Sequence, residues 1–205
     1  MQTWAKTNRT SDLRVVRRVM AKIFDSVSKN LAKIARDSHR VTDGKVRDKE
    51  QRSGYSHKIH MDYNFATLGV DPYSQVKWEK RDVVMKNWQT GETTFEQRGV
   101  EFPEFWSINA TNIVTSKYFH GVLGSSDREN SLKQLIDRVV GKYIEQSKID
   151  DVFDGEVSRD IFANELKYLL VNQMFSFNSP VWFNVGTEAP QQVSACFILG
   201  VDDTM

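Results

Sequence analysis

The feature that most constrains the fold is the run VSACFILGV at residues 193–201, which is apolar at almost every position. Strands that are covered on both faces have such runs, as in parallel sheets and barrels, whereas a half-exposed strand alternates polar and apolar residues. A strand of this kind needs neighbours, and only DDTM follows it in the sequence. The run therefore predicts a sheet or barrel whose other strands are not in this sequence.

This run contains Cys196, the single cysteine of the chain. One cysteine cannot form an internal disulfide, so the composition gives no reason to expect secretion. The N-terminal residues lack the apolar stretch of a secretory signal, and no run approaches the ~20 apolar residues of a membrane span. We therefore expect a cytoplasmic protein with no membrane partner. A buried lone cysteine is ordinarily an inert small hydrophobe, so composition alone assigns it no chemistry.

Charge is unevenly distributed along the chain, which favours a separate N-terminal extension. Residues 1–60 hold 15 Lys and Arg against 6 Asp and Glu, whereas residues 61–205 hold 13 against 21. Residues 11–36 place apolar side chains at helical spacing, with Arg and Lys between them. Such a helix suits nucleic acid, a partner chain or a membrane surface, or it packs its apolar stripe on the rest of the protein. Residues 37–56 are polar and predict a linker.

The central part of the sequence predicts a hairpin followed by two helices. VVMKNW and TTFEQRGV flank a turn at residues 89–92, which is typical of two paired strands. The first helix, 131–146, begins at Ser131 with Gln134 in the capping-box position. The second, 158–175, is expected to begin at Ser158 and to bury Phe162, Leu166, Leu169 and Leu170. Pro180 predicts that the helix ends before it and that an extended segment follows.

Two polar stretches are weak candidates for metal sites. His57 and His60 have a spacing that could hold a metal ion, but no cysteine or acidic cluster accompanies them, so we expect no metal there. The acidic connection 148–156 lacks the ligand spacing of a calcium loop and predicts a solvated loop.

Several blocks of the sequence together resemble one enzyme family. FNSPVWFNVGTEAPQQVSACFILGVDDTM, residues 177–205, resembles the start of the catalytic barrel in class II ribonucleotide reductases, the adenosylcobalamin-dependent group. Residues 69–84, 95–119 and 131–140 resemble the N-terminal domain of that family. The resemblance implies an α/β fold in which a largely helical α+β N-terminal domain, residues 61–175, leads into a ten-stranded α/β barrel. Residues 176–205 would be the start of that barrel, truncated after its first strand, and residues 1–60 match nothing in the family.

The resemblance also implies a reaction and its site residues. The family converts ribonucleotides to 2′-deoxyribonucleotides by thiyl-radical chemistry, as a ribonucleoside-diphosphate reductase does. Cys196 matches one thiol of the redox-active reducing pair. Ser179 matches a residue that holds the substrate diphosphate, and Ala195 with Cys196 matches the positions that line the ribose.

The same resemblance implies cofactors and partners outside this sequence. The second thiol of the pair and the radical-bearing cysteine are absent from a chain with one Cys, so we expect this chain alone to be inactive. Adenosylcobalamin would bind mainly to parts of the family fold that are not present here. The expected partners are a ribonucleotide substrate, a second polypeptide that completes the barrel, and a thioredoxin-type reductant. The alternative is a non-catalytic binding protein whose basic N-terminal helix engages nucleic acid or a partner chain, which salt-sensitive DNA binding would support.

Overall fold

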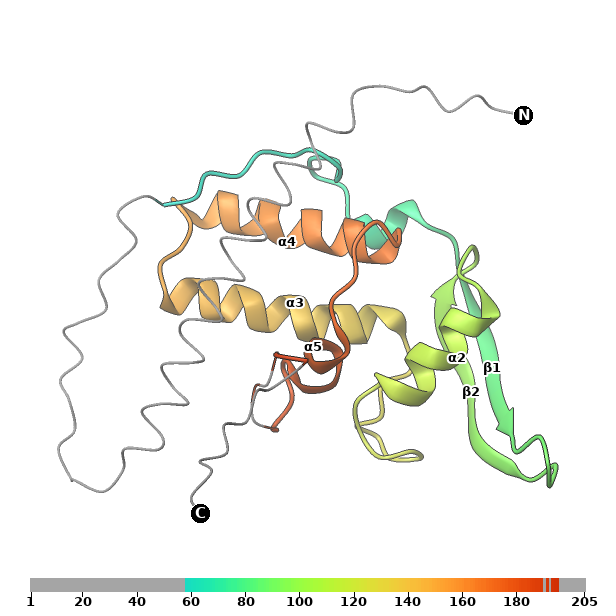
Figure 1. Ribbon diagram of the computed structural model, residues 1–205. Coiled ribbons are helices and arrows are strands. Elements are labelled where there is room, and N and C mark those ends of the chain that lie inside the picture. Colours follow the sequence, from blue (N-terminus) through green and yellow to red (C-terminus); the bar gives the residue numbers. More distant parts are fainter. Residues whose placement is uncertain (1–57, 190, 192, 196–205) are drawn as a thin grey trace, which may run out of the picture. The chain divides into compact units, whose positions relative to one another are not determined.

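The computed structural model describes residues 58–189, 191 and 193–195. They belong to one structural unit of the chain, Ser53–Met205. Its described part combines helices with a two-stranded sheet, so it is a mixed α and β structure (Figure 1). In chain order the elements are η1 (Pro72–Gln75), β1 (Trp78–Lys86), β2 (Thr93–Pro103), α2 (Ile108–Lys117), α3 (Leu132–Ile149), α4 (Glu156–Val171) and α5 (Ser179–Asn184).

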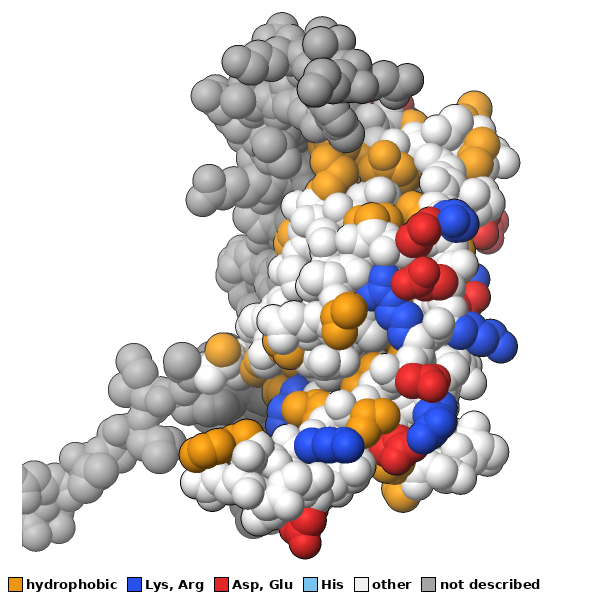
Figure 2. Space-filling model, turned by 90° about the vertical axis from the view of Figure 1, so that its right-hand side faces the viewer, with side chains coloured by type: hydrophobic (Ala, Val, Ile, Leu, Met, Phe, Trp, Pro, Cys, Tyr) orange, Lys and Arg blue, Asp and Glu red, His pale blue; other side chains and the backbone are white. Residues whose placement is uncertain are grey.

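The predicted hairpin is confirmed, and its strands are longer than the sequence indicated. Strand β1 pairs antiparallel with β2, in a register that places Trp78 opposite Pro103 and Val84 opposite Glu96. In the turn, the Asn87 side chain accepts a hydrogen bond from the amide of Gln89 (2.9 Å). On the face that carries the hairpin, acidic and basic side chains are interleaved with single apolar ones (Figure 2). Three of the ion pairs in and beside the hairpin are Arg81–Glu79, Lys77–Glu104 and Arg98–Glu96.

Helix α3 begins as predicted. The Ser131 side chain accepts a backbone hydrogen bond from the first turn, and the Gln134 side chain accepts one from the amide of Ser131 (3.2 Å), so the capping box is confirmed. Helices α3 and α4 lie alongside each other and form the centre of the unit (Figure 1). The buried residues of α3 are Leu132, Leu135, Ile136, Val139, Val140, Tyr143 and Ser147.

Helix α4 begins two residues earlier than predicted. Its N-cap is Gly155, which makes no side-chain cap, and Glu156 opens the helix. Ser158 was expected to be the first residue, but it is buried inside the first turn, where its hydroxyl accepts a hydrogen bond from the amide of Met61 (3.1 Å). The predicted buried face is confirmed for Phe162, Leu166, Leu169 and Leu170.

The segment that precedes the hairpin in the sequence runs alongside α4 in the structure (Figure 1). Both carboxylate oxygens of Glu165 face its backbone and accept hydrogen bonds from the amides of residues 64–66. Ile59 forms a parallel bridge with Phe153 in the loop between α3 and α4. That loop was predicted to be solvated, and this is wrong for Val152 and Phe153, which are buried in the core.

Helix α2 was not predicted. Its sequence, INATNIVTSK, is rich in Ile, Val, Thr and Asn, whose helix propensities are modest. It forms because the Ser107 side chain caps it by accepting from the amide of Ala110 (3.1 Å) and because the hairpin packs on it. The Arg81 guanidinium of β1 also donates to the Thr111 hydroxyl of this helix (2.7 Å).

The prediction of an extended segment after Pro180 is wrong, because residues 179–184 form the short helix α5. Proline is compatible with the first turn of a helix, since the amide hydrogen that it lacks has no partner within the helix there. The predicted strand 193–201 is described only at residues 193–195, which are not in a strand, and the remainder lies outside the described residues. The first barrel strand therefore stays a prediction, as do the basic helix and linker within residues 1–57. Among the helices that the structure describes, none is long and apolar enough to span a bilayer.

Candidate functional site

Asn178 joins the two segments that carry the predicted site residues. Its side-chain oxygen accepts a hydrogen bond from the amide of Val181 (3.3 Å), which caps α5 and fixes the helix turn that holds Ser179. Its side-chain nitrogen donates to the carbonyl of Val193 (3.0 Å), two residues before Ala195. The structure therefore brings the Ser179 turn beside the residues that lead to Cys196, while Cys196 itself lies outside the described residues.

The Ser179 side chain is exposed at the start of α5 and faces the side chain of Tyr118. The two hydroxyl oxygens lie 3.1 Å apart, and either can donate. Tyr118 follows directly after α2, so this contact joins parts of the chain that are 61 residues apart. The Tyr118 ring also lies against Phe183 of α5, with ring centroids 5.3 Å apart. No local pattern in the sequence indicated a role for Tyr118.

The C-terminal end of α5 is held by Arg138 of α3, which forms a buried ion pair with Glu129 in the loop before that helix. Arg138 donates to Glu129 through Nε (2.7 Å), and both side chains are about one-tenth exposed. The same guanidinium donates to the carbonyls of Val185 (2.6 Å) and Trp182 (3.2 Å). These carbonyls have no partner inside so short a helix, so the arginine satisfies them.

Gly186 allows the close approach of this segment to α3. It has a φ of +76°, and a Cβ atom at this position would lie 2.6 Å from the Arg138 carbonyl oxygen. Glycine is the residue that adopts this backbone conformation at little cost and has no side chain to collide with the helix. Neither the ion pair nor this glycine contact was expected from the sequence, because the pair joins a loop residue to a helix residue nine positions later and the glycine contact joins α3 to a segment beyond α5.

The loop after α5 is folded around the side chain of Gln191. The side-chain nitrogen of Gln191 shares its two hydrogens among the carbonyls of Asn184 (3.1 Å), Thr187 (2.9 Å) and Ala189 (2.8 Å). Its side-chain oxygen accepts from the amide of Gly186 (2.9 Å). One side chain therefore ties the connection between α5 and residues 193–195 into a compact loop.

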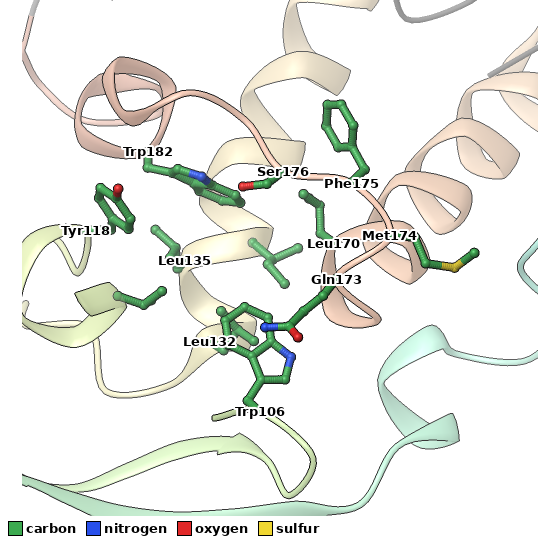
Figure 3. A pocket seen from close by; sticks show the side chains of 12 residues that line it. Trp106, Tyr118, Leu132, Leu135, Leu170, Gln173, Met174, Phe175, Ser176 and Trp182 are labelled. Atoms are coloured by element: carbon green, nitrogen blue, oxygen red, sulfur yellow. The ribbon is translucent and has the colours of Figure 1, made fainter. Parts of the chain in front are cut away.

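An open, mostly apolar cavity of about 330 Å³ lies between α5 and the ends of α2 and α4 (Figure 3). Trp106 and Trp182 form opposite walls, and Leu132, Leu135 and Leu170 lie between them. The Trp106 indole donates to the carbonyl of Val171 (2.8 Å), which fixes that wall on the last turn of α4. The remaining lining residues are Val114, Tyr118, Ile136, Gln173, Met174, Phe175 and Ser176.

Comparison with known proteins identifies the family of this region. Residues 80–173 match the family of class II vitamin B12-dependent ribonucleotide reductases. A vitamin B12-dependent ribonucleotide reductase of Streptomyces coelicolor is 63% identical over 139 residues, which are 68% of this chain and 14% of that protein. Over this region the chain belongs to the class II ribonucleotide reductases. A reductase of Streptomyces clavuligerus is 62% identical over 139 residues (68% of this chain, 14% of that protein), and one of Rhodopirellula baltica is 36% identical over 166 residues (67% and 16%).

The reductase match covers the residues that pack against α5, but not α5 itself. Residues 80–173 run from β1 through the end of α4, and they include both Tyr118 and the Arg138–Glu129 pair. Helix α5 with Ser179 follows this match. The chain spans about one-seventh of the length of the Streptomyces reductases that it matches.

His60 makes ion pairs with two carboxylates. Its ring nitrogen Nδ1 lies 2.6 Å from Asp154, and Nε2 lies 3.5 Å from Asp62. The hydrogen bond and the charge of Asp154 raise the pKa of His60, and the Ser158 hydroxyl together with His60 lowers the pKa of Asp154. Within the part of the chain that the structure describes, no three His, Cys, Asp or Glu side chains are grouped to hold a metal ion, and His57 is not described.

Proposed function

We propose that this chain supplies the N-terminal part of a vitamin B12-dependent ribonucleotide reductase that converts ribonucleotides to 2′-deoxyribonucleotides. Family membership supports the reaction class. The structural observation that supports it best is the double role of Asn178, which caps the helix turn of Ser179 and binds the backbone just before Ala195 and Cys196. This arrangement suits a site in which both segments contact one substrate.

Cys196 is proposed to be one of the two thiols that reduce the substrate. In the net reaction the C2′–O bond breaks and the 2′-hydroxyl leaves as water, while a hydrogen replaces it at C2′. Two thiols supply the two electrons and two hydrogens that this requires, and they end as a disulfide. The partner thiol and the thiol that carries the radical belong to other parts of the enzyme. Residues 61–175 then form the N-terminal domain, and residues 176–205 begin the α/β barrel.

Ser179 and Ala195 are proposed to contact the substrate. Ser179 is exposed, and its helix turn is held by the Asn178 cap and by the Tyr118 hydroxyl, so its Oγ is available to donate to a phosphate oxygen. Ala195 is exposed and carries only a methyl group, which leaves room for the ribose beside the backbone. The diphosphate contact of Ser179 and the ribose contact of Ala195 rest on the family resemblance.

The cofactor of the proposed reaction is adenosylcobalamin, which supplies the radical that begins ribonucleotide reduction. The described residues offer no cluster of metal ligands. We assign cobalamin binding mainly to other parts of the family fold, as the resemblance implies. The proposed partners are a polypeptide that completes the barrel and a thioredoxin-type reductant.

Reconstitution tests this function. The full chain is mixed with a polypeptide comprising the part of the Streptomyces coelicolor reductase that follows its matched segment, together with adenosylcobalamin and a dithiol. Ribonucleoside di- and triphosphates are supplied in turn, and deoxyribonucleotide formation is measured. We expect activity that requires both polypeptides and is lost in Cys196→Ser, whereas Ser126→Ala in an exposed loop leaves it unchanged. Failure to form product with either substrate, or full activity of Cys196→Ser, would contradict the proposal.

A further inference from the structure

The family assignment does not account for the contact between the Tyr118 and Ser179 hydroxyls. Both hydroxyls lie at the surface, and their oxygens are 3.1 Å apart. Neither is needed to satisfy a buried group, because water could bind each of them. A hydrogen bond that is unnecessary for folding but fixes an exposed side chain is a candidate for substrate orientation.

The Tyr118 hydroxyl is rigidly placed relative to α5. The phenol ring is stacked on Trp182, with ring centroids 6.4 Å apart and an angle of 30° between the planes, and it is tilted against Phe183. The Tyr118 carbonyl accepts a hydrogen bond from Arg138 (3.3 Å), the same guanidinium that binds the end of α5. The aromatic contacts come from the helix that carries Ser179, so the phenol and the serine are held by one local framework.

The two hydroxyls together can donate one hydrogen bond to a ligand. Each hydroxyl has one hydrogen, and the contact between them uses one, so one O–H remains to donate outward. A phenol is the stronger donor and an aliphatic alcohol the better acceptor, which favours donation from Tyr118 to Ser179 Oγ. The hydrogen of Ser179 is then free, and donation from the phenol strengthens it as a donor. Its natural acceptor is an anionic oxygen such as that of a phosphate group.

We propose that Tyr118 is a positioning residue that orients the Ser179 hydroxyl toward the phosphate group of the ribonucleotide substrate. This inference rests on the proposed function, because it takes Ser179 as a substrate contact. Without the phenol oxygen, the serine side chain is free to rotate among its three rotamers, and only a fraction of molecules present the hydrogen correctly. The effect is therefore on substrate binding rather than on the chemical step.

A double-mutant cycle in the reconstituted enzyme tests this role. Tyr118→Phe keeps the ring contacts and removes only the hydroxyl, and Ser179→Ala removes its partner. We expect Tyr118→Phe to raise KM about fivefold with little change in kcat, the factor expected for one neutral hydrogen bond. The double variant should have the KM of Ser179→Ala, because the phenol acts only through the serine. The matched control is Tyr63→Phe, which removes a hydroxyl that contacts Asn164 (3.3 Å) and should leave KM unchanged.

The outcomes separate this inference from the function on which it rests. If Ser179→Ala leaves KM unchanged in an active enzyme, Ser179 is not a substrate contact and the proposed role of Ser179 fails. If Ser179→Ala raises KM but Tyr118→Phe does not, or if their effects on KM multiply, the positioning role of Tyr118 is wrong. Thermal unfolding of the full chain adds a second readout. A lowered Tm for Tyr118→Phe with an unchanged KM would show that the hydroxyl serves only stability.

Discussion

Replacing Arg138 by Met should destabilise the fold strongly, because it removes the partner of a buried carboxylate. The guanidinium makes five hydrogen bonds, two to Glu129 and three to the carbonyls of Tyr118, Trp182 and Val185. After the substitution Glu129 retains the amide of His120 as a donor (2.8 Å) and the charge of the neighbouring Arg128, but it loses its ion-pair partner while remaining 8% exposed.

The expected loss follows from the energetics of buried ion pairs. Removing one partner of such a pair costs about 3–5 kcal/mol, because the other charge remains buried and uncompensated. A domain of ordinary stability has about 5–15 kcal/mol to lose, so Arg138→Met should remove a large fraction of it. Adding Glu129→Gln removes the unpaired charge. The double variant should therefore be more stable than the sum of the two single effects predicts, with a coupling of about 1–3 kcal/mol.

Urea unfolding of the full chain, followed by tryptophan fluorescence, measures these free energies. Trp106 and Trp182 line the cavity beside α5, so they report on the region that Arg138 holds. Arg98→Met is the matched control, since Arg98 also pairs with a glutamate but its side chain is 70% exposed. We expect its unfolding midpoint to stay close to that of the unmodified chain. An Arg138→Met variant that unfolds at the same urea concentration as Arg98→Met, or additive effects in the double variant, would refute the reasoning.

Three further predictions concern other parts of the described structure. Gly186→Ala should destabilise the chain by more than about 1 kcal/mol, because its Cβ meets the backbone of α3 and its φ is +76°. Glu165→Gln should speed hydrogen exchange of the amides of residues 64–66, measured by NMR, since an amide oxygen is a weaker acceptor than a carboxylate. The His60–Asp154 ion pair should stabilise the fold most between about pH 4 and 6.5, as seen when the urea midpoint is compared with that of His60→Gln.

The direction of the pH effect follows from the two pKa shifts. The pKa of His60 is raised above 6.5, so its contribution is full below 6.5 and is lost as pH rises through the raised value. The pKa of Asp154 is lowered below 3.8, so its contribution is full above 3.8 and is lost as pH falls through the lowered value. If the difference between the urea midpoints of the unmodified chain and His60→Gln grows above pH 7, the raised pKa of His60 is not the source of the stabilisation. Replacing His120 by Gln serves as the control for loss of a histidine.

Each of the other two predictions has a matched comparison. Gly91 has nearly the same φ, +74°, but nothing lies within 4 Å of the place that an alanine Cβ would take there, so Gly91→Ala isolates the backbone cost from the collision. Equal losses for Gly91→Ala and Gly186→Ala would show that close packing on α3 is unimportant. Glu156→Gln, at the exposed first residue of α4, controls for loss of a charge on that helix. If it changes exchange at residues 64–66 as much as Glu165→Gln does, the direct hydrogen bonds are not the cause.

The local elements that were predicted correctly are those whose chemistry is contained in a few adjacent residues. The Ser131–Gln134 capping box and the hairpin turn need only side chains that are close in sequence, so their spacing reveals them. Helix α2 was not predicted because its helix propensity is modest and its stability comes from the Ser107 cap and the hairpin that packs on it. Pro180 was misinterpreted because the same residue ends one helix and is also suited to the first turn of another.

The candidate site also contains residues that the sequence indicated and residues that it did not indicate. Ser179, Ala195 and Cys196 were found through the resemblance of residues 177–205 to one family, and their roles stay predictions. Asn178 holds backbone at two places, through its bonds to Val181 and Val193. No residue spacing pointed to Tyr118.

The sequence by itself determined the reductase family, the hairpin and the two long helices α3 and α4. It also determined the residue at which α3 begins. Only the tertiary structure decided which residues hold the candidate site together, namely Arg138 with Glu129 at one end of α5 and Tyr118 at the other. The physical reason is that caps and turns are satisfied within a few residues of the chain. A buried ion pair or a hydroxyl contact across 61 residues exists only after the helices have packed, and no local pattern encodes it.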